Sequence, residues 1–180
     1  LKMESLPRKI PKIIHQMWIG NQEHRPIEMM RTWRDKHPDY EYILWDNDKI
    51  ASHKFRSTLA IESAREIVGK VDIMRWEILY EYGGIFLDAD SICLEPIDEN
   101  IFLNRAAFAT FENENLRAGL VAIGTMGFVP KHPLIGDIID YLNTDDAIRQ
   151  LETYRSWYSV GPGLLTRMLD TNRYSNMITI

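Results

Sequence analysis

The amino-acid sequence predicts an α/β fold, because segments with strand-like patterns alternate along it with segments that have helix-like patterns. The clearest pair is a helix-like stretch at 71–82 that is followed, after two glycines, by the short apolar run 85–87. A continuous apolar run is typical of a strand that is covered on both faces. Asp88 and Asp90 follow that run directly. Open α/β sheets bind ligands at the carboxyl ends of their strands, so we expect a functional site at these two aspartates.

Length and composition limit the classes of protein to which the chain can belong. Its 180 residues suit one hydrophobic core, so we expect a single domain over 1–180. The formal net charge of −5 argues against nucleic acid as a partner, because nucleic-acid-binding proteins present a basic face. No run in the sequence approaches the roughly 18 to 20 apolar residues of a membrane span, so we expect no transmembrane segment in this chain. The single cysteine, Cys93, excludes an internal disulfide and is expected in the core.

Two strand patterns and one helix pattern are expected in the first part of the chain. The strands are predicted at 12–19 and 40–45, and the helix between them at 26–37. Trp18 is either a core residue or an aromatic face for a ligand. Asp48 belongs to a polar loop directly after the second strand, where it can reach a ligand or take part in a helix cap.

The helix-like stretch 71–82 has apolar residues at the spacing of an amphipathic helix. Asp72 and Arg75 lie off the apolar stripe and are three residues apart, so they are neighbours on the helix surface. One interpretation is an ordinary surface ion pair, which contributes little to stability. The other is a polar wall of a site, with Arg75 facing a phosphate and Asp72 facing hydroxyl groups or orienting Arg75.

The two aspartates themselves allow two interpretations. If strand geometry continues through Asp90, Asp88 and Asp90 point to the same side and can bind Mg²⁺ or Mn²⁺ together with substrate phosphates. An isolated D-x-D can equally be a solvated turn. His15, on the first predicted strand, has no second histidine or cysteine near it in the sequence. We therefore expect it to be a hydrogen-bonded structural residue rather than a metal ligand.

The second half of the chain gives a coarser set of elements. A glycine–threonine pair at 124–125 separates two of the predicted strands. A proline begins each of the predicted helices, as is common at the first helical position. The predicted strands are 91–96, 102–111, 120–123 and 126–129, and the predicted helices are 133–142 and 162–169.

The residues around the two aspartates resemble a known family. The pattern D-x-x-R followed by L-Y-x-x-G-G-I-F-x-D-x-D, from Asp72 to Asp90, resembles the glycosyltransferases that contain a DXD motif. These include yeast-type initiating mannosyltransferases, bacterial capsular polysaccharide transferases and the glucosylating domains of clostridial toxins. The stretch 10–20, IPKIIHQMWIG, is similar to the family's opening pattern I-P-K-x-I-H-x-x-W. Two ordered motifs are far more specific than either motif alone.

The resemblance implies a GT-A type fold, with a single mixed sheet flanked by helices. It implies a hexosyltransferase that uses a UDP- or GDP-sugar, acts on an acceptor hydroxyl of a glycan, a lipid-linked molecule or a protein, and retains the anomeric configuration. Asp88 and Asp90 would bind Mn²⁺ or Mg²⁺ and, with Arg75, form the catalytic set. The residues that would bind the nucleotide sugar are Trp18, Asp48, Asp72, Arg75 and Asp88. Acceptor contacts are expected on the loops 104–118 and 143–160.

Two other classes of protein stay open. A non-catalytic nucleotide-sugar binder is one, because relatives have a sugar-contacting asparagine where this chain has Gly124 and Thr125, and they continue with a further segment beyond the point matching Ile180. A haloacid-dehalogenase-type phosphatase is the other, although such enzymes usually have Thr or Val where this chain has Ile92. The expected location is the cytoplasm, or a membrane reached through parts that are not in this chain.

Overall fold

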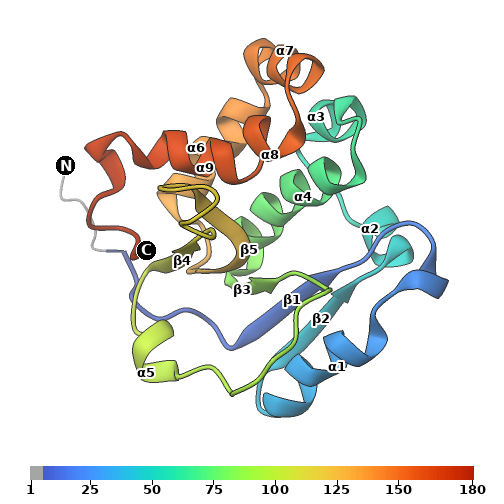
Figure 1. Cartoon of the computed structure of the whole chain (residues 1–180), viewed down its shortest axis with the longest axis vertical. Helices are drawn as coiled ribbons and strands as arrows, with labels where there is room; N and C mark the ends of the chain where they lie inside the picture. The colour runs from blue at the N-terminus through green and yellow to red at the C-terminus, as the bar shows by residue number, and fades with distance from the viewer. Residues whose placement is uncertain (1–5) are drawn as a thin grey trace.

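The computed structural model describes residues 6–180, and its strands form one five-stranded sheet in the order β2-β1-β3-β5-β4 (Figure 1). The strands are β1 (Ile13–Met17), β2 (Glu41–Trp45), β3 (Gly84–Leu87), β4 (Ala107–Phe111) and β5 (Val121–Phe128). β1 is parallel to β2 and β3, whereas β5 is antiparallel to β3 and β4. The predicted mixed sheet is confirmed. The predicted domain, 1–180, includes residues 1–5, which lie outside the described residues.

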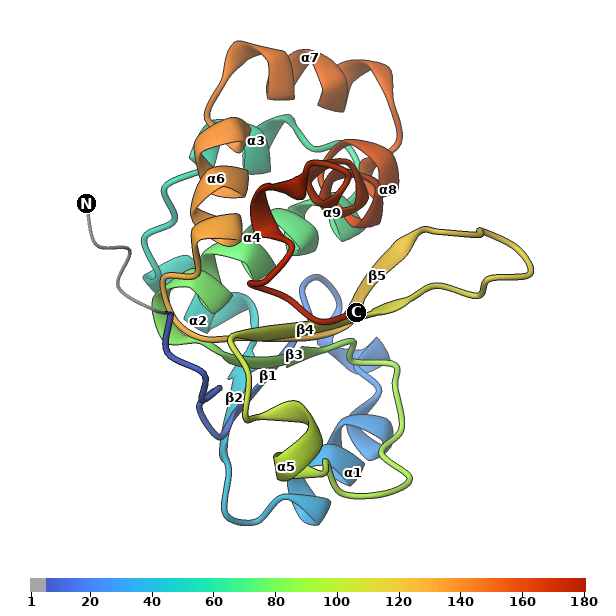
Figure 2. The same cartoon turned by 90° about the vertical axis from the view of Figure 1, so that its left-hand side faces the viewer.

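Helices cover both faces of this sheet (Figure 2). α1 (Ile27–Lys36) and α5 (Glu99–Phe102) lie on one face, and most of the other helices lie on the opposite face. The remaining α-helices are α2 (Asn47–Ser52), α3 (Thr58–Ser63), α4 (Ile67–Tyr82), α6 (Pro133–Leu142), α7 (Asp145–Thr153), α8 (Ser156–Ser159) and α9 (Pro162–Leu169). Two 3₁₀ turns are η1 (Gln22–His24) and η2 (Asn172–Tyr174). Among the described residues, no helix is long and apolar enough to cross a membrane.

The central strand β3 is covered on both faces, as its apolar run predicts. Ile85 and Leu87 belong to the core on the α5 side, and Phe86 belongs to the larger core on the α4 side. All three side chains are at most 1% exposed. This alternation follows from the strand geometry, in which successive side chains point to opposite faces. The strand is therefore held firmly up to the point where the two aspartates follow it.

The middle of helix α4 is buried all round, so the prediction of an amphipathic helix is wrong. Every residue from Asp72 to Leu79 is buried. The reason is that α3, α6 and α8 pack against the side that would otherwise face solvent, while β3 and β5 lie on the sheet side. Gly83 ends the helix with a φ of 64° and a ψ of −166°, and the positive φ favours glycine.

Several other predicted elements need correction. The stretch 91–96 is irregular, although Cys93 within it is buried as expected. The pair at 124–125 does not interrupt a strand, because Thr125 pairs with Leu87 in one continuous β5. The stretch 102–111 forms a strand only from 107 onward. The helices predicted at 26–37, 133–142 and 162–169 are confirmed to within one residue at each end.

Candidate functional site

The aspartate pair lies in a turn at the end of β3. The strand ends at Leu87, and Asp88 to Asp90 continue as a turn. The backbone fixes this turn: the Asp88 N–H donates to the carbonyl of Gly124 (2.9 Å), and the Asp88 carbonyl accepts from the N–H of Ser91 (3.2 Å). The expectation that strand geometry reaches Asp90 is therefore wrong. The two carboxylates nevertheless line the same two cavities, so they converge by a different backbone path.

Those two cavities meet at the turn. The first, of about 470 Å³, extends toward Trp18 and the loop after β1. The second, of about 500 Å³, extends between α4, β5 and the start of α9. Arg75, Asp88 and Asp90 line both cavities. A ligand that crosses the turn would thus contact one arginine and two carboxylates at its middle.

Arg75 is fixed by contacts on several sides. It is 4% exposed, and its guanidinium donates to Asp88 Oδ1 (2.8 Å) and to the carbonyl of Ile123. Its guanidinium carbon lies 4.7 Å from the centroid of the Phe86 ring, within the range of a cation–π contact. The carboxylate that pairs with Arg75 is thus Asp88, and not Asp72 as one interpretation of the sequence has it. The charge of Arg75 is already offset by Asp88 before any ligand binds.

Asp72 is a buried carboxyl group on the wall of the second cavity. Its exposed fraction is 3%. Burial raises the pKa of Asp72 to about 7, although the nearby charge of Arg75 acts in the opposite direction. A Cβ atom at Gly161 would lie 2.6 Å from Asp72 Oδ2, so this close approach requires glycine. The side chain can therefore both accept and donate a hydrogen bond near neutral pH.

Trp18 is not a core residue. It is partly exposed and lines the first cavity, and its indole N–H donates to the carbonyl of Asn21 (2.9 Å). Asp48, in contrast, is exposed in the first turn of α2 and is not brought to either cavity. Its neighbour Asp46 caps α2 by accepting from the N–H of Lys49 (2.9 Å). The helix cap expected in this polar loop is present, although Asp46 and not Asp48 forms it.

Two further residues of the second cavity were not predicted individually. Arg117, in the loop between β4 and β5, and Trp157, on α8, both line it. The guanidinium carbon of Arg117 lies 5.0 Å from the centroid of the Trp157 ring. Among the described residues, Arg117 has no ion pair, unlike Arg75. Both lie within the ranges where acceptor contacts are expected, although 143–160 forms α7 and α8 and is not the predicted loop. Nothing in the local sequence indicates that the two side chains meet.

Asp88 and Asp90 are the side chains of this site that can bind a divalent cation. Asp90 is exposed, and Asp88 Oδ2 is not used in the pair with Arg75. The described residues contain no group of three or more His, Cys, Asp or Glu side chains arranged for a metal. Mg²⁺ is usually held by one or two carboxylates, with substrate phosphates and water completing its coordination. The donor set fits a cation that binds together with a phosphate ligand.

Comparison with known proteins supports the resemblance seen in the sequence. Residues 23–108 match the model of the "glycosyltransferase sugar-binding region containing DXD motif". The predicted resemblance to the DXD glycosyltransferases is thus confirmed for this part of the chain. The DXD stretch of that family here comprises Asp88, Ala89 and Asp90.

Curated proteins of similar sequence match most of this chain. Inositol phosphoceramide mannosyltransferase 3 of Schizosaccharomyces pombe is 29% identical over 164 residues, which is 87% of this chain and 44% of the relative. The human alpha-1,4-N-acetylglucosaminyltransferase is 33% identical over 146 residues, which is 80% of this chain and 34% of the relative. The chain thus spans less than half the length of these two relatives.

Solved structures support the GT-A-like fold. The glycosyltransferase PaToxG superposes with a TM-score of 0.71 at 20% identity, covering 94% of this chain and 70% of PaToxG. The glycosyltransferase domain of the YGT toxin superposes with a TM-score of 0.64 at 8% identity, covering 96% of this chain and 80% of that domain. At these identities the likeness concerns the fold alone, and the predicted fold class is confirmed.

Proposed function

We propose that the protein is a metal-dependent glycosyltransferase that moves a hexose from a UDP- or GDP-sugar to an acceptor hydroxyl, with retention of configuration. The observation that carries the proposal is the position of the DXD turn between two cavities. On one side is the partly exposed Trp18, and on the other is the buried carboxyl of Asp72. A nucleotide sugar has the matching order of groups: an aromatic base, a diphosphate and a sugar.

Each part of the donor has a suitable partner in this arrangement. The base would stack on Trp18, since aromatic faces bind bases without requiring a particular one. The diphosphate would lie at Asp88 and Asp90 with the bound cation. The sugar would lie in the second cavity, where Asp72 can hydrogen-bond its hydroxyl groups. The roles expected for these four residues are part of the proposal.

The chain must also offset negative charge on the departing diphosphate. When bound at Asp88 and Asp90, Mn²⁺ or Mg²⁺ supplies Lewis-acid stabilisation of that charge. Arg75 holds the Asp88 carboxylate in place through its 2.8 Å contact, and so it orients the metal-binding group. Arg117 lines the second cavity without a carboxylate partner among the described residues, so its charge is available to the donor.

Gly124 offers a physical reason for one departure from the family pattern. A Cβ atom at this position would lie 2.6 Å from Asp88 Oδ2, so the larger asparagine of relatives would displace that carboxylate. The missing sugar contact keeps a second function open, that of a non-catalytic nucleotide-sugar binder. A nucleotide sugar that binds but is neither hydrolysed nor transferred would favour this second function over the glycosyltransferase.

Donor hydrolysis and sugar transfer in the wild type and in Asp90→Asn test the proposal. The substitution keeps the shape of the side chain and removes its charge, so we expect a loss of about 100-fold or more. Asp35→Asn, which alters an exposed aspartate on α1, is the matched control and should keep full activity. Phosphate release from simple phosphate esters without a nucleotide sugar would instead favour a phosphatase. Equal activity of Asp90→Asn and the wild type would overturn the role of the DXD turn.

A further inference from the structure

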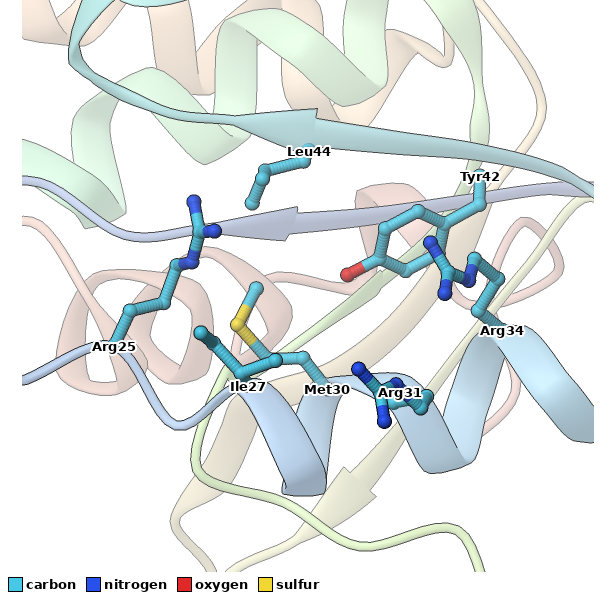
Figure 3. A pocket seen from close by; sticks show the side chains of 7 residues that line it. All are labelled: Arg25, Ile27, Met30, Arg31, Arg34, Tyr42 and Leu44. Carbon is cyan, nitrogen blue, oxygen red and sulfur yellow. The ribbon is translucent and has the colours of Figure 1, made fainter. Parts of the chain in front are cut away.

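A separate hollow of about 140 Å³ lies between α1 and the edge strand β2 (Figure 3). Its lining includes three arginines, Arg25, Arg31 and Arg34, and no acidic residue. Figure 3 shows Arg25 and Arg34 on opposite sides, with the hydroxyl of Tyr42 directed into the space between them. No residue of this lining is shared with the two cavities at the DXD turn. In a chain with a net charge of −5, the hollow is a local concentration of positive charge.

The three guanidinium groups are only weakly compensated. Arg31 lies 3.4 Å from Glu28, and Arg34 lies 4.0 Å from Asp35, with all four side chains about half or more exposed. Arg25 donates to the neutral amide oxygen of Gln22 (3.2 Å). Exposed pairs of this kind contribute little and exchange readily. The arginines are therefore free to bind an external anion.

The floor of the hollow is apolar. Met30 is buried, Leu44 is partly buried, and Ile27 is 46% exposed. Guanidinium groups bind phosphate with paired, charge-assisted hydrogen bonds. An apolar floor beneath such groups suits a substituent carried by the same molecule. The two kinds of surface together describe an amphipathic anion.

We propose that this hollow binds a phosphate ester, with the phosphate held by Arg25, Arg31 and Arg34 and its apolar substituent lying over Ile27 and Leu44. The ester can be a small soluble molecule or the headgroup of a lipid, since both present the same chemistry. This site shares no lining residue with the donor site proposed above.

A chain of two hydrogen bonds connects the hollow to the DXD turn. The Tyr42 hydroxyl donates to Gln16 Oε1 (2.8 Å), and Gln16 Nε2 donates to the carbonyl of Asp88 (3.1 Å). Gln16 is fully buried, so it has no competing contact with solvent. A ligand that contacts the Tyr42 hydroxyl would therefore be connected, through the Gln16 side chain, to the backbone of the DXD turn.

The test is calorimetric titration of the chain with phenyl phosphate and with inorganic phosphate, in the absence of nucleotide and metal. We expect phenyl phosphate to bind more tightly than inorganic phosphate. In Arg25→Ala/Arg34→Ala, binding should weaken about tenfold or more, because two charge-assisted contacts are lost. The matched control is Arg149→Ala/Arg173→Ala, which removes two exposed arginines elsewhere and changes the net charge equally. That control should bind phenyl phosphate as the wild type does.

Sedimentation with phosphatidylcholine vesicles that contain phosphatidic acid distinguishes a lipid headgroup from a small soluble phosphate ester. Vesicle binding that is lost in Arg25→Ala/Arg34→Ala but kept in the control identifies a lipid headgroup, and phenyl phosphate binding without vesicle binding identifies a soluble ester. The proposal is overturned if the wild type binds neither probe, or if the two double variants lose binding equally. Equal affinities for phenyl phosphate and inorganic phosphate would overturn the role of the apolar floor. Retained donor binding in every variant separates these outcomes from a failure of the donor site.

Discussion

The buried carboxyl of Asp72 makes stability depend on pH in a defined direction. Its pKa is about 7 in the folded chain, against an ordinary value of 3.8. The folded state therefore binds this proton more tightly than the unfolded state does. The stability that the protonated Asp72 carboxyl contributes is fully present below about pH 4 and is lost as the pH rises through 7. A shift of about three pKa units corresponds to at most about 4 kcal/mol.

The variant Asp72→Asn removes the charge and keeps the shape of the side chain. We compare the stability of Asp72→Asn minus that of the wild type at two pH values. This difference should be more favourable to the variant at pH 8 than at pH 4.5 by a few kcal/mol, and by at most about 4 kcal/mol. Urea unfolding across this range, in chelator-containing buffer, measures the difference. Asp35→Asn, on the exposed surface of α1, should follow the wild-type profile throughout. Parallel profiles for Asp72→Asn and the wild type would refute the argument that a buried carboxyl is present here.

Other contacts lead to three further predictions. Burial lowers the pKa of His15 to about 4, so this residue should contribute a loss of stability of up to about 3 kcal/mol as the pH falls from 6.5 through 4. The same urea series, extended to pH 4, should therefore show the stability of the wild type falling relative to that of His15→Gln. Gly83→Ala should lower the free energy of unfolding by more than about 1–2 kcal/mol, because Gly83 has a φ of 64° and an added Cβ would lie 2.6 Å from the Pro130 ring. Gly119→Ala is the control: Gly119 also has a positive φ but has open space around it, so urea unfolding should show a smaller loss. Trp18→Ala should weaken nucleotide binding by about 1–3 kcal/mol in calorimetry, and Trp18→Phe should restore most of it; equal affinities for all three proteins would exclude stacking.

The parts of the fold that the sequence predicts correctly have a strong local pattern. The apolar run of β3, the glycine at the end of α4 and the prolines that begin α6 and α9 each determine local geometry. His15 is also as predicted: its ring nitrogens contact the Gly83 carbonyl (2.8 Å) and the indole N–H of Trp45 (3.1 Å). The first three features depend on neighbouring residues, which a sequence shows. For His15, the sequence indicates a structural role but not its partners, which lie 68 and 30 residues away.

The burial of α4 could not be predicted because distant segments provide it. Trp76 donates to the carbonyl of Val160 (2.9 Å), and the Glu77 carboxylate accepts from the backbone N–H groups of Arg56 and Ser57. A glutamate within a helix is normally expected at the surface. Only the folded chain shows that a loop provides its hydrogen-bond donors.

The same limit applies to the candidate site. The pair of Arg75 with Asp88 joins α4 to the turn after β3, and the contact of Arg117 with Trp157 joins the β4–β5 loop to α8. The motif identifies Arg75 and Asp88 as residues of interest, but it does not indicate that they pair with each other. Arg117 has no motif around it, so only its position on the cavity wall identifies it.

The central claim is that the DXD turn binds a nucleotide diphosphate together with a cation. Calorimetric titration of UDP and of GDP into the wild type and Asp90→Asn, with Mn²⁺ and with a chelator, tests it most directly. We predict that one nucleotide binds the wild type only when Mn²⁺ is present, and that Asp90→Asn loses this binding while remaining folded. Binding that survives both the chelator and the substitution, or no binding of either nucleotide with Mn²⁺, would contradict the claim.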